Sequence, residues 1–336
     1  MIDVNVSISG IMMCCDDSIC SIDLGNGYHI EKCLFDSLPF KDRIIDGRGN
    51  LITDYYSSRV IDDEHTFFIC IKKQDVFQIN APVFSSDKRV LSAEDFLCVD
   101  ELEKYMDKEM DYLNEVVNLL RLFKSGNIGF RDVFFQYSFS VMNFIYNTLN
   151  HTSHNQTRNI IANGKFSLNK DDVVACNNWI KEYYGLPYEL LKKSIEEFSW
   201  GLEQVDISTG FEQYTTALEM TLLPKNQPGK KQMLANRISA LIGNPPTEVQ
   251  QLHQKVVSFY RFRSESLHEG DDTNLSIAEL RELEDITRKV LRKCLIRCKS
   301  EYDLNCGITW SEVKDKIIND LINKVNALKT AGVLSN

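Results

Sequence analysis

An arginine and a histidine near the end of one long helical segment are the residues of this sequence best suited to chemistry on a phosphate. Arg263 and His268 are separated by four residues in the segment 258–270. Histidine titrates near neutral pH and can act as general base or general acid. Arginine keeps its charge and offers a planar set of donors to phosphate oxygens. The pair could therefore bind a phosphate and move a proton.

RNA cleavage without a metal needs a base for the 2′-hydroxyl proton, an acid for the leaving 5′-oxygen and positive charge beside the phosphorane. One Arg-His pair supplies one titrating group, whereas two pairs would supply both. The spacing also fits an arginine and a histidine with only structural roles at a solvated helix end. The neighbouring segments must therefore decide between these interpretations.

Hydrophobic residues at helical spacing predict a series of helices before and after the pair in the sequence. A basic loop, 225–231, follows the stop signal at Pro224, and Gly243 with two following prolines ends another helix. The predicted helices cover 190–202, 211–223, 233–242, 247–270, a segment opened by the capping box 276–279, and 311–328.

The order of these segments resembles the ApeA-like branch of the HEPN families. In that branch a Tyr/Arg-Ser-x-x-x-His-Gly segment follows a helix, a lysine-rich loop and a helix of the type Arg-Ile-Ala-x-Leu-Leu-Gly. Here Lys230-Lys231-Gln232 leads into Arg237-Ile238-Ser239-Ala240-Leu241-Ile242-Gly243, and Arg263-Ser264 precedes His268. The resemblance covers roughly residues 186–300.

The resemblance implies a metal-independent endoribonuclease without a cofactor, acting as a symmetric homodimer in which two Arg-x4-His motifs meet. Arg263 would bind or stabilise the phosphate, and His268 would transfer the proton. Ser264 and Glu265 would support the motif. The family link also suggests a growth-arresting toxin in anti-phage defence by abortive infection, with host RNA as the substrate and tRNA as one candidate.

Other cations near the motif are expected to contact the RNA backbone. They are Arg261, Lys230, Lys231 and Arg237. One position departs from the family pattern, because Glu269 stands between His268 and Gly270 where the family usually has glycine directly after histidine. A carboxylate there would either raise the pKa of His268 or shield the site from RNA.

Two rival hypotheses use the same fold. One is a non-catalytic RNA- or nucleotide-binding module, or an interaction partner of a separate toxin. The other is a purely structural dimer, which predicts no affinity for RNA. Replacing His268 by alanine abolishes cleavage if the chain is a ribonuclease and leaves binding largely intact if it is a binding module.

Composition indicates a soluble, globular chain long enough for about two domains. It is 43% hydrophobic and 26% charged, and no apolar run approaches the ~18 residues of a membrane span. We expect a cytoplasmic protein. The net charge of −10 argues against a surface made for non-specific nucleic-acid binding, yet residues 211–299 hold 14 Lys and Arg against 11 Asp and Glu. An anionic ligand would therefore be met by the C-terminal part.

Ten cysteines are scattered without a Cys-x-x-Cys, which favours reduced thiols and no metal site. A site built from Cys294, Cys298 and Cys306 lacks a fourth ligand at zinc spacing. His151 and His154 are more typical of a polar loop than of a metal site.

The N-terminal residues 1–90 read as a small β-rich domain that senses a trigger or selects a substrate. Residues 2–9 alternate apolar and polar, and Gly25-Asn26-Gly27 is typical of a tight hairpin between 21–24 and 28–31. Two more strands are expected at 66–71 and 76–83, the latter limited by Pro82.

Residues 91–185 are interpreted as a helical connecting region and 186–336 as the HEPN-like domain. The first helix would start at Ser92 and end at Gly126, and a second would cover 130–149 with an aromatic stripe. A polar linker at 150–170 and a helix through Tyr183 would follow. The predicted fold class is α+β, a small β-rich N-terminal domain followed by an all-α HEPN-type helical bundle.

Overall fold

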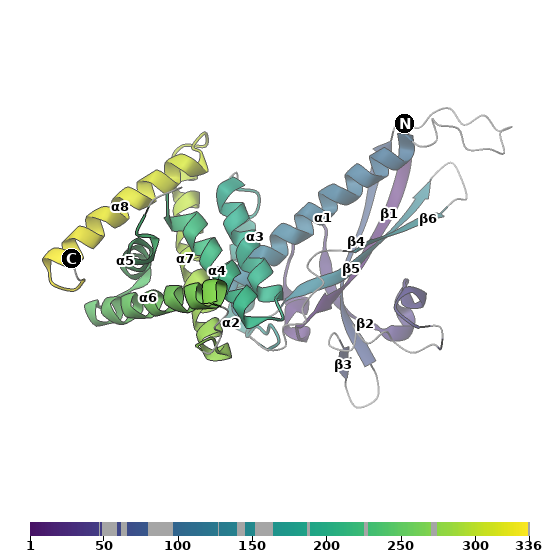
Figure 1. Cartoon of the computed structure of the whole chain (residues 1–336). Helices are drawn as coiled ribbons and strands as arrows, with labels where there is room; N and C mark the ends of the chain where they lie inside the picture. The colour runs from purple at the N-terminus through teal and green to yellow at the C-terminus, as the bar shows by residue number, and fades with distance from the viewer. Residues whose placement is uncertain are drawn as a thin grey trace. The chain divides into compact units, whose positions relative to one another are not determined.

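A computed structural model of the chain describes residues 1–46, 48, 59–61, 66–79, 97–126, 128–139, 145–151, 164–186, 189–224, 228–269 and 274–334. An N-terminal antiparallel sheet is followed by a helical region, so the predicted α+β class is confirmed (Figure 1). The chain divides into two compact units. The first holds 1–120, 126–157 and 165–182, and the second holds 121–125, 158–164 and 183–336.

The first unit is built on one antiparallel sheet, which has six strands in the described residues. The strands are β1 (Ile2–Met13), β2 (His29–Leu34), β3 (Arg59–Ile61), β4 (Thr66–Ile79), β5 (Gly129–Phe139) and β6 (Ile145–His151). Their order is β2-β4-β1-β5-β6, with β3 also paired to β4. The predicted strand at 2–9 is confirmed and continues to Met13. It lies at the centre, with Ile2 opposite Ile79 of β4 and Val4 opposite Phe139 of β5.

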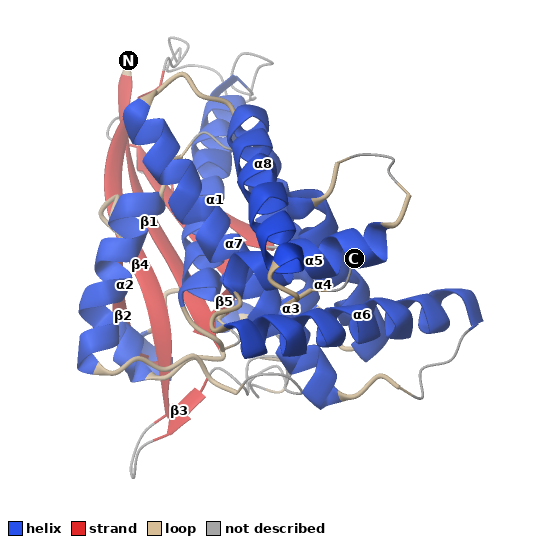
Figure 2. Cartoon of the chain, turned by 90° about the vertical axis from the view of Figure 1, so that its left-hand side faces the viewer, coloured by secondary structure: helices blue, strands red, loops and turns tan. Residues whose placement is uncertain are grey.

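One face of this sheet is covered by α1 (Leu97–Phe123), as Figures 1 and 2 show. Because side chains alternate along a strand, Val4, Val6 and Ile8 of β1 are all buried on one side. The ring of Tyr105 from α1 stacks on Phe77 of β4, with 4.1 Å between centroids. Burial of this apolar face holds the helix against the sheet.

A buried charge network also ties α1 to the sheet. Oε2 of Glu109 accepts hydrogen bonds from Lys73 at 2.9 Å, from the Tyr28 hydroxyl at 2.8 Å and from Asn26 at 3.2 Å. Lys73 also lies 3.1 Å from Asp75. Buried charges are tolerated only when they are paired and hydrogen-bonded, and this network satisfies both conditions.

The opposite face has an apolar cluster at one end, where the short 3₁₀ helices η2 (Phe35–Ser37) and η3 (Lys41–Arg43) lie. Phe40 stacks on Phe134 of β5 with 3.8 Å between ring centroids. Ile11, Cys33, Phe68 and Cys70 belong to the same cluster.

The predicted helix at 130–149 is wrong, because this segment contains β5 and β6. In β5, Phe135 and Tyr137 are buried on the α1 face while Gln136 between them is exposed. That alternation has the period of a strand, and the crowded aromatic residues concealed it. The sheet therefore extends to His151 and does not end near residue 90.

The predicted turn at 25–27 is confirmed, but the predicted hairpin is wrong. Gly25, Asn26 and Gly27 have φ values of 76°, 50° and 77°, and the Tyr28 amide donates to the Gly25 carbonyl at 2.9 Å. The preceding segment forms the 3₁₀ helix η1 (Asp17–Ser21), whereas β2 pairs with β4. The expected strands at 66–71 and 76–83 form the single strand β4, while Pro82, Ser92 and most of the expected linker, 152–163, lie outside the described residues.

The predicted helices after residue 169 are confirmed. They are α2 (Lys170–Tyr183), α3 (Glu189–Glu203), α4 (Ile207–Leu222), α5 (Lys230–Ile242), α6 (Pro246–Glu269), α7 (Ile277–Leu304) and α8 (Trp310–Thr330). All but α2, which belongs to the first unit apart from its last residue, form the second unit. None of the helices in the described residues is long and apolar enough to cross a membrane.

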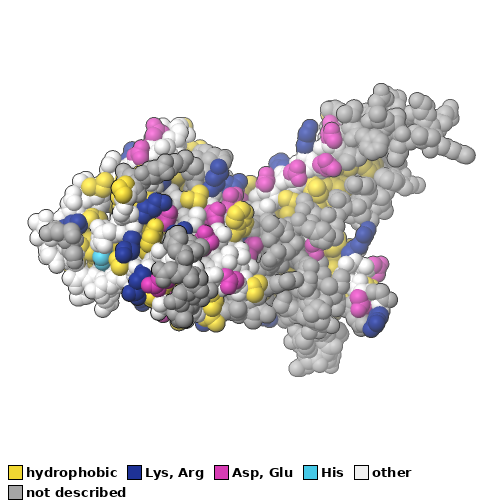
Figure 3. Space-filling model, viewed as in Figure 1, with side chains coloured by type: hydrophobic (Ala, Val, Ile, Leu, Met, Phe, Trp, Pro, Cys, Tyr) yellow, Lys and Arg dark blue, Asp and Glu magenta, His cyan; other side chains and the backbone are white. Residues whose placement is uncertain are grey.

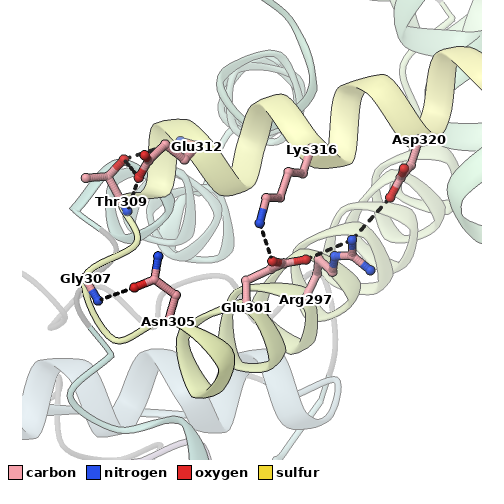
Figure 4. Close-up of polar contacts among 8 residues, drawn as sticks. All are labelled: Arg297, Glu301, Asn305, Gly307, Thr309, Glu312, Lys316 and Asp320. Atoms are coloured by element: carbon pink, nitrogen blue, oxygen red, sulfur yellow. Dashed lines mark hydrogen bonds and ion pairs between the residues drawn. The ribbon is translucent and has the colours of Figure 1, made fainter.

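Helices α7 and α8 are joined by a capped turn and an ion-pair cluster (Figure 4). Thr309 caps α8 by accepting from the Glu312 amide at 3.4 Å, while Glu312 accepts from the Thr309 amide at 2.8 Å. Glu301 of α7 lies 2.6 Å from Lys316 of α8 and 2.9 Å from Arg297. The cap and the cluster together fix where α8 starts relative to α7.

Replacing Thr309 by alanine is expected to lower the free energy of unfolding by about 1 kcal/mol, because an N-cap hydroxyl and its partner in the capping box are lost. Urea denaturation followed by circular dichroism measures the change. Thr330 lies on the last turn of α8, and its hydroxyl donates to the Asn326 carbonyl of the same helix at 2.9 Å. Thr330→Ala is the control and should change the stability by less than half as much.

Candidate functional site

The Arg-x4-His motif lies in the last two turns of α6. Residues on the inner side of this helix bind it to the bundle: Val256 and Phe259 are buried, and the Phe259 ring meets Phe211 of α4 edge to face at 5.5 Å. Arg263 follows Phe259 by one turn and so lies on the side that faces α4. The side chain of His268 lies outside the described residues.

Arg263 reaches a carboxylate on α4 that also binds a lysine from α5. Nη1 of Arg263 lies 3.3 Å from Oε1 of Glu219, and Nζ of Lys230 lies 3.0 Å from Oε2. Tyr260, three residues before Arg263, lies close enough to the same carboxylate that burial, followed by the charge of Glu219, raises the pKa of Tyr260. These four residues, Glu219, Lys230, Tyr260 and Arg263, are referred to below as the Glu219 cluster.

The guanidinium of Arg263 is only partly used in this cluster. Glu219 takes Nη1, and the charged group lies over the Tyr260 ring at 5.8 Å. Its Nε is buried and has no hydrogen-bond partner in the part of the chain that the structure describes. An unpaired buried donor costs about 1–3 kcal/mol, so an acceptor that reached Nε would be favoured.

The Glu219 cluster is more open to solvent than the buried ion pair of Arg121 and Glu203 in the same unit. The side chains of Arg263, Glu219 and Lys230 are 20%, 15% and 42% exposed. In contrast, Arg121 and Glu203 meet at 2.6 Å with exposed fractions of 1% and 7%. Figure 3 shows Lys and Arg side chains close together on the face that α5 and α6 present. An anion from solution can therefore reach the cluster.

Arg237, a predicted RNA contact, is placed inside the protein instead. It is buried and donates to the carbonyl of Leu222, the last residue of α4, and burial lowers the pKa of Arg237. Lys314 bonds to two more carbonyls there, Met220 at 2.6 Å and Leu223 at 2.9 Å. The last carbonyls of a helix have no partner within it, and cations suit that end of the helix dipole. Arg237 thus fixes the end of α4 that carries Glu219.

The remaining predicted residues do not belong to the Glu219 cluster. Arg261 lies on a different side of α6, with its Nε 3.5 Å from Glu265 and its guanidinium 5.2 Å from the Phe262 ring. Glu265 also accepts from Asn274 at 3.1 Å. Ser264 and Lys231 are exposed. Of the predicted residues whose side chains the structure describes, it brings together Arg263 and Lys230.

Sequence reasoning did not identify Glu219 and Tyr260 as site residues. One signal for Glu219 was present, since Glu212 and Glu219 are the only charged residues of α4. A carboxylate next to the buried Leu218 needs a partner, which pointed to a cation on a neighbouring helix.

No group of three or more metal-ligating side chains is arranged to hold a metal ion within the described residues. Cys294 and Cys298 are buried on α7, whereas Cys306 is exposed. Burial raises the pKa of Cys294 to about 12, so this thiol stays protonated at neutral pH.

The first unit has a separate hollow of about 590 Å³ on the sheet face opposite α1, a volume within the range of small-molecule sites. Its lining comes from β1, β4 and β5 and consists of Asn5, Val6, Ser7, Gln74, Asp75, Val76, Gln136 and Ser138. The carboxylate of Asp75 is turned to the α1 face, where Lys73 and the Tyr105 hydroxyl engage it at 3.1 Å and 2.8 Å. The hollow offers amides and hydroxyls for binding and no free acid or base for catalysis.

Comparisons with protein-family models, with curated proteins and with solved structures found no match to this chain.

Proposed function

We propose that this chain is a metal-independent endoribonuclease of the ApeA-like HEPN type. The observation that supports the proposal is the convergence of Arg263, Lys230 and Tyr260 on the carboxylate of Glu219. Two cations from two helices already hold one oxyanion with the Tyr260 ring beside them, close to the helix end that carries His268. A phosphodiester presents the same kind of oxygens.

In the proposed reaction, Arg263 and Lys230 hold the scissile phosphate. His268 takes the proton of the 2′-hydroxyl, and the 2′-oxygen attacks phosphorus. The bond from phosphorus to the 5′-oxygen then breaks, which leaves a 2′,3′-cyclic phosphate on one product. The other product receives a proton and becomes a 5′-hydroxyl. His268 of a second copy of the chain would supply that proton, so the enzyme works as a homodimer.

The wider role follows the same proposal. The RNA would be a host RNA, with tRNA as one candidate, and cleavage would arrest growth during phage infection. The first unit would sense the trigger or select the substrate, and the hollow on its sheet would be one place for a small ligand to bind.

A second candidate function is a non-catalytic RNA-binding module. It is favoured by one observation, that Glu219 already neutralises part of the charge of Arg263. Under this alternative the cluster binds phosphate without cleaving RNA.

The test is incubation of the purified full chain with total tRNA and mRNA in excess EDTA, followed by mapping of product ends. We expect cleavage to survive chelation and to leave cyclic-phosphate or 3′-phosphate ends with 5′-hydroxyls. Cleavage that requires a divalent metal, or leaves 5′-phosphates, would contradict the mechanism. RNA that is bound but stays intact would support the binding module.

A further inference from the structure

The Glu219 carboxylate occupies the position that an RNA phosphate needs. It lies between Arg263 and Lys230, with Oε1 bound to Arg263 and Oε2 bound to Lys230. A phosphodiester that used both cations would have to place its oxygens where those of Glu219 now lie, because both cannot share the same donors without two negative charges in contact.

We infer that Glu219 is an internal competitor for the substrate phosphate, which must leave the cluster before RNA can bind. This inference rests on the proposed function and adds its regulation: at rest the site is filled by the chain's own anion.

The geometry indicates that this carboxylate can be displaced. The distance of 3.3 Å to Arg263 exceeds the ~2.7–2.9 Å of a strong charge-assisted hydrogen bond. The pair between Arg121 and Glu203 in the same unit is 2.6 Å long and almost fully buried, so it is the tighter of the two. The longer, more exposed contact of Glu219 is weaker, and water can solvate the released carboxylate.

The unused donor of Arg263 gives an RNA phosphate an advantage over Glu219. Nε is buried without a partner among the described residues, whereas Glu219 engages Nη1. A phosphate has more acceptor oxygens than a carboxylate and can take Nε together with a terminal nitrogen, in the bidentate manner typical of Arg–phosphate pairs. The exchange would therefore add a hydrogen bond that the resting cluster lacks.

The same contacts also fit a second role for Glu219, the positioning of the two cations. If Glu219 serves to position Arg263 and Lys230, its removal would scatter the two cations and weaken RNA binding. The two roles predict opposite signs for the same substitution.

The experiment uses the full chain and a single-stranded RNA decamer whose 2′-oxygens are methylated. The methyl groups block the attacking oxygen, so binding is measured without cleavage. Fluorescence anisotropy compares wild type with Glu219→Gln and with Glu212→Gln. Glu212 is the matched control, because it lies two turns earlier on α4, is also half-buried and is outside the cluster.

We expect Glu219→Gln to bind the decamer about tenfold more tightly, since a like charge facing the phosphate is removed while the side-chain shape is kept. Glu219→Asp keeps the charge on a shorter side chain and should lie between wild type and Glu219→Gln, which provides a second reading if the glutamine protein is unstable. Glu212→Gln should bind as wild type does. Unchanged or weaker binding by Glu219→Gln would overturn the inference and assign Glu219 a positioning role.

Cleavage of the unmethylated decamer by the same proteins separates the two proposals. Cleavage by wild type with no gain in binding for Glu219→Gln would contradict the competitor role of Glu219 and support the ribonuclease proposal. A gain in binding without cleavage by any of the proteins would sustain the competitor role and count against the ribonuclease. No binding by any protein would overturn both.

Discussion

Replacing His268 by alanine is expected to lower the rate of RNA cleavage about 10²–10⁴-fold, the usual contribution of one general acid or base. Replacing Arg263 by alanine should cause a loss of similar size, because positive charge beside the phosphorane is removed. Arg263→Lys should recover only part of it, since lysine restores the charge without the planar set of donors. Initial rates on a defined RNA in EDTA provide the measurement.

The matched control is His253→Ala. His253 lies on the same helix α6, where its ring contacts Gln232 of α5 at 2.7 Å, and it is outside the Glu219 cluster. Its replacement should leave the cleavage rate within twofold. Thermal melting followed by circular dichroism checks that each variant is folded. A folded His268→Ala protein that cleaved RNA at the wild-type rate would disprove the role of this histidine.

The second large effect concerns stability. Glu203→Ala is expected to lower the free energy of unfolding by about 3–5 kcal/mol, because the guanidinium of Arg121 loses its buried carboxylate partner at 2.6 Å. The Arg121 side chain is only 1% exposed, so water cannot replace that partner. The neighbouring pair of Arg288 and Glu284 is also buried, and Arg288 donates to the Arg121 carbonyl at 2.8 Å. Removing Glu203 should therefore also weaken the pair of Arg288 and Glu284 through the contact of Arg288 with Arg121.

An exposed ion pair of the same unit is the control. Lys255 and Glu282 are 44% and 41% exposed, so Glu282→Ala should cost less than about 1 kcal/mol. Urea denaturation measures both variants. A variant with Arg121 and Glu203 both replaced by methionine should be more stable than Glu203→Ala, because neither charge of this pair is left buried without the other. A change below 1 kcal/mol for Glu203→Ala would show that the pair contributes little.

The helices of the second unit could be predicted from sequence because their signals are local. Ser276 caps α7 by accepting from the Glu279 amide at 3.3 Å, which is one half of the predicted capping box, and α5 ends before Gly243. At Gly243 an added Cβ would lie 2.6 Å from the Ser239 carbonyl oxygen, which explains why the residue there is glycine. Such signals act over one turn of helix and need no knowledge of the fold.

The strands β5 and β6 and the Glu219 cluster depend on long-range contacts. Phe134 and Phe135 follow each other yet face opposite sides of the sheet, one packed against Phe40 and the other buried under α1. In a segment this rich in aromatic residues, the hydrophobic pattern of an amphipathic helix cannot be told from that of a strand buried on both faces. Likewise, Glu219 and Arg263 are 44 positions apart, and only the packing of α4 against α6 brings them together.

The central place of β1 has a consequence for synthesis on the ribosome. Strand β1 is made before the other strands of this sheet, and it pairs with β4 through residues as late as Ile79 and with β5 through residues as late as Phe139. At about 5–20 residues per second, β1 waits roughly 6–25 s for its second neighbour. During that time an alternating, partly apolar strand has one edge or both edges unpaired, and such edges template association between chains. The nascent chain is thus most prone to aggregate before β5 emerges, and folding limited by such distant pairing is slow.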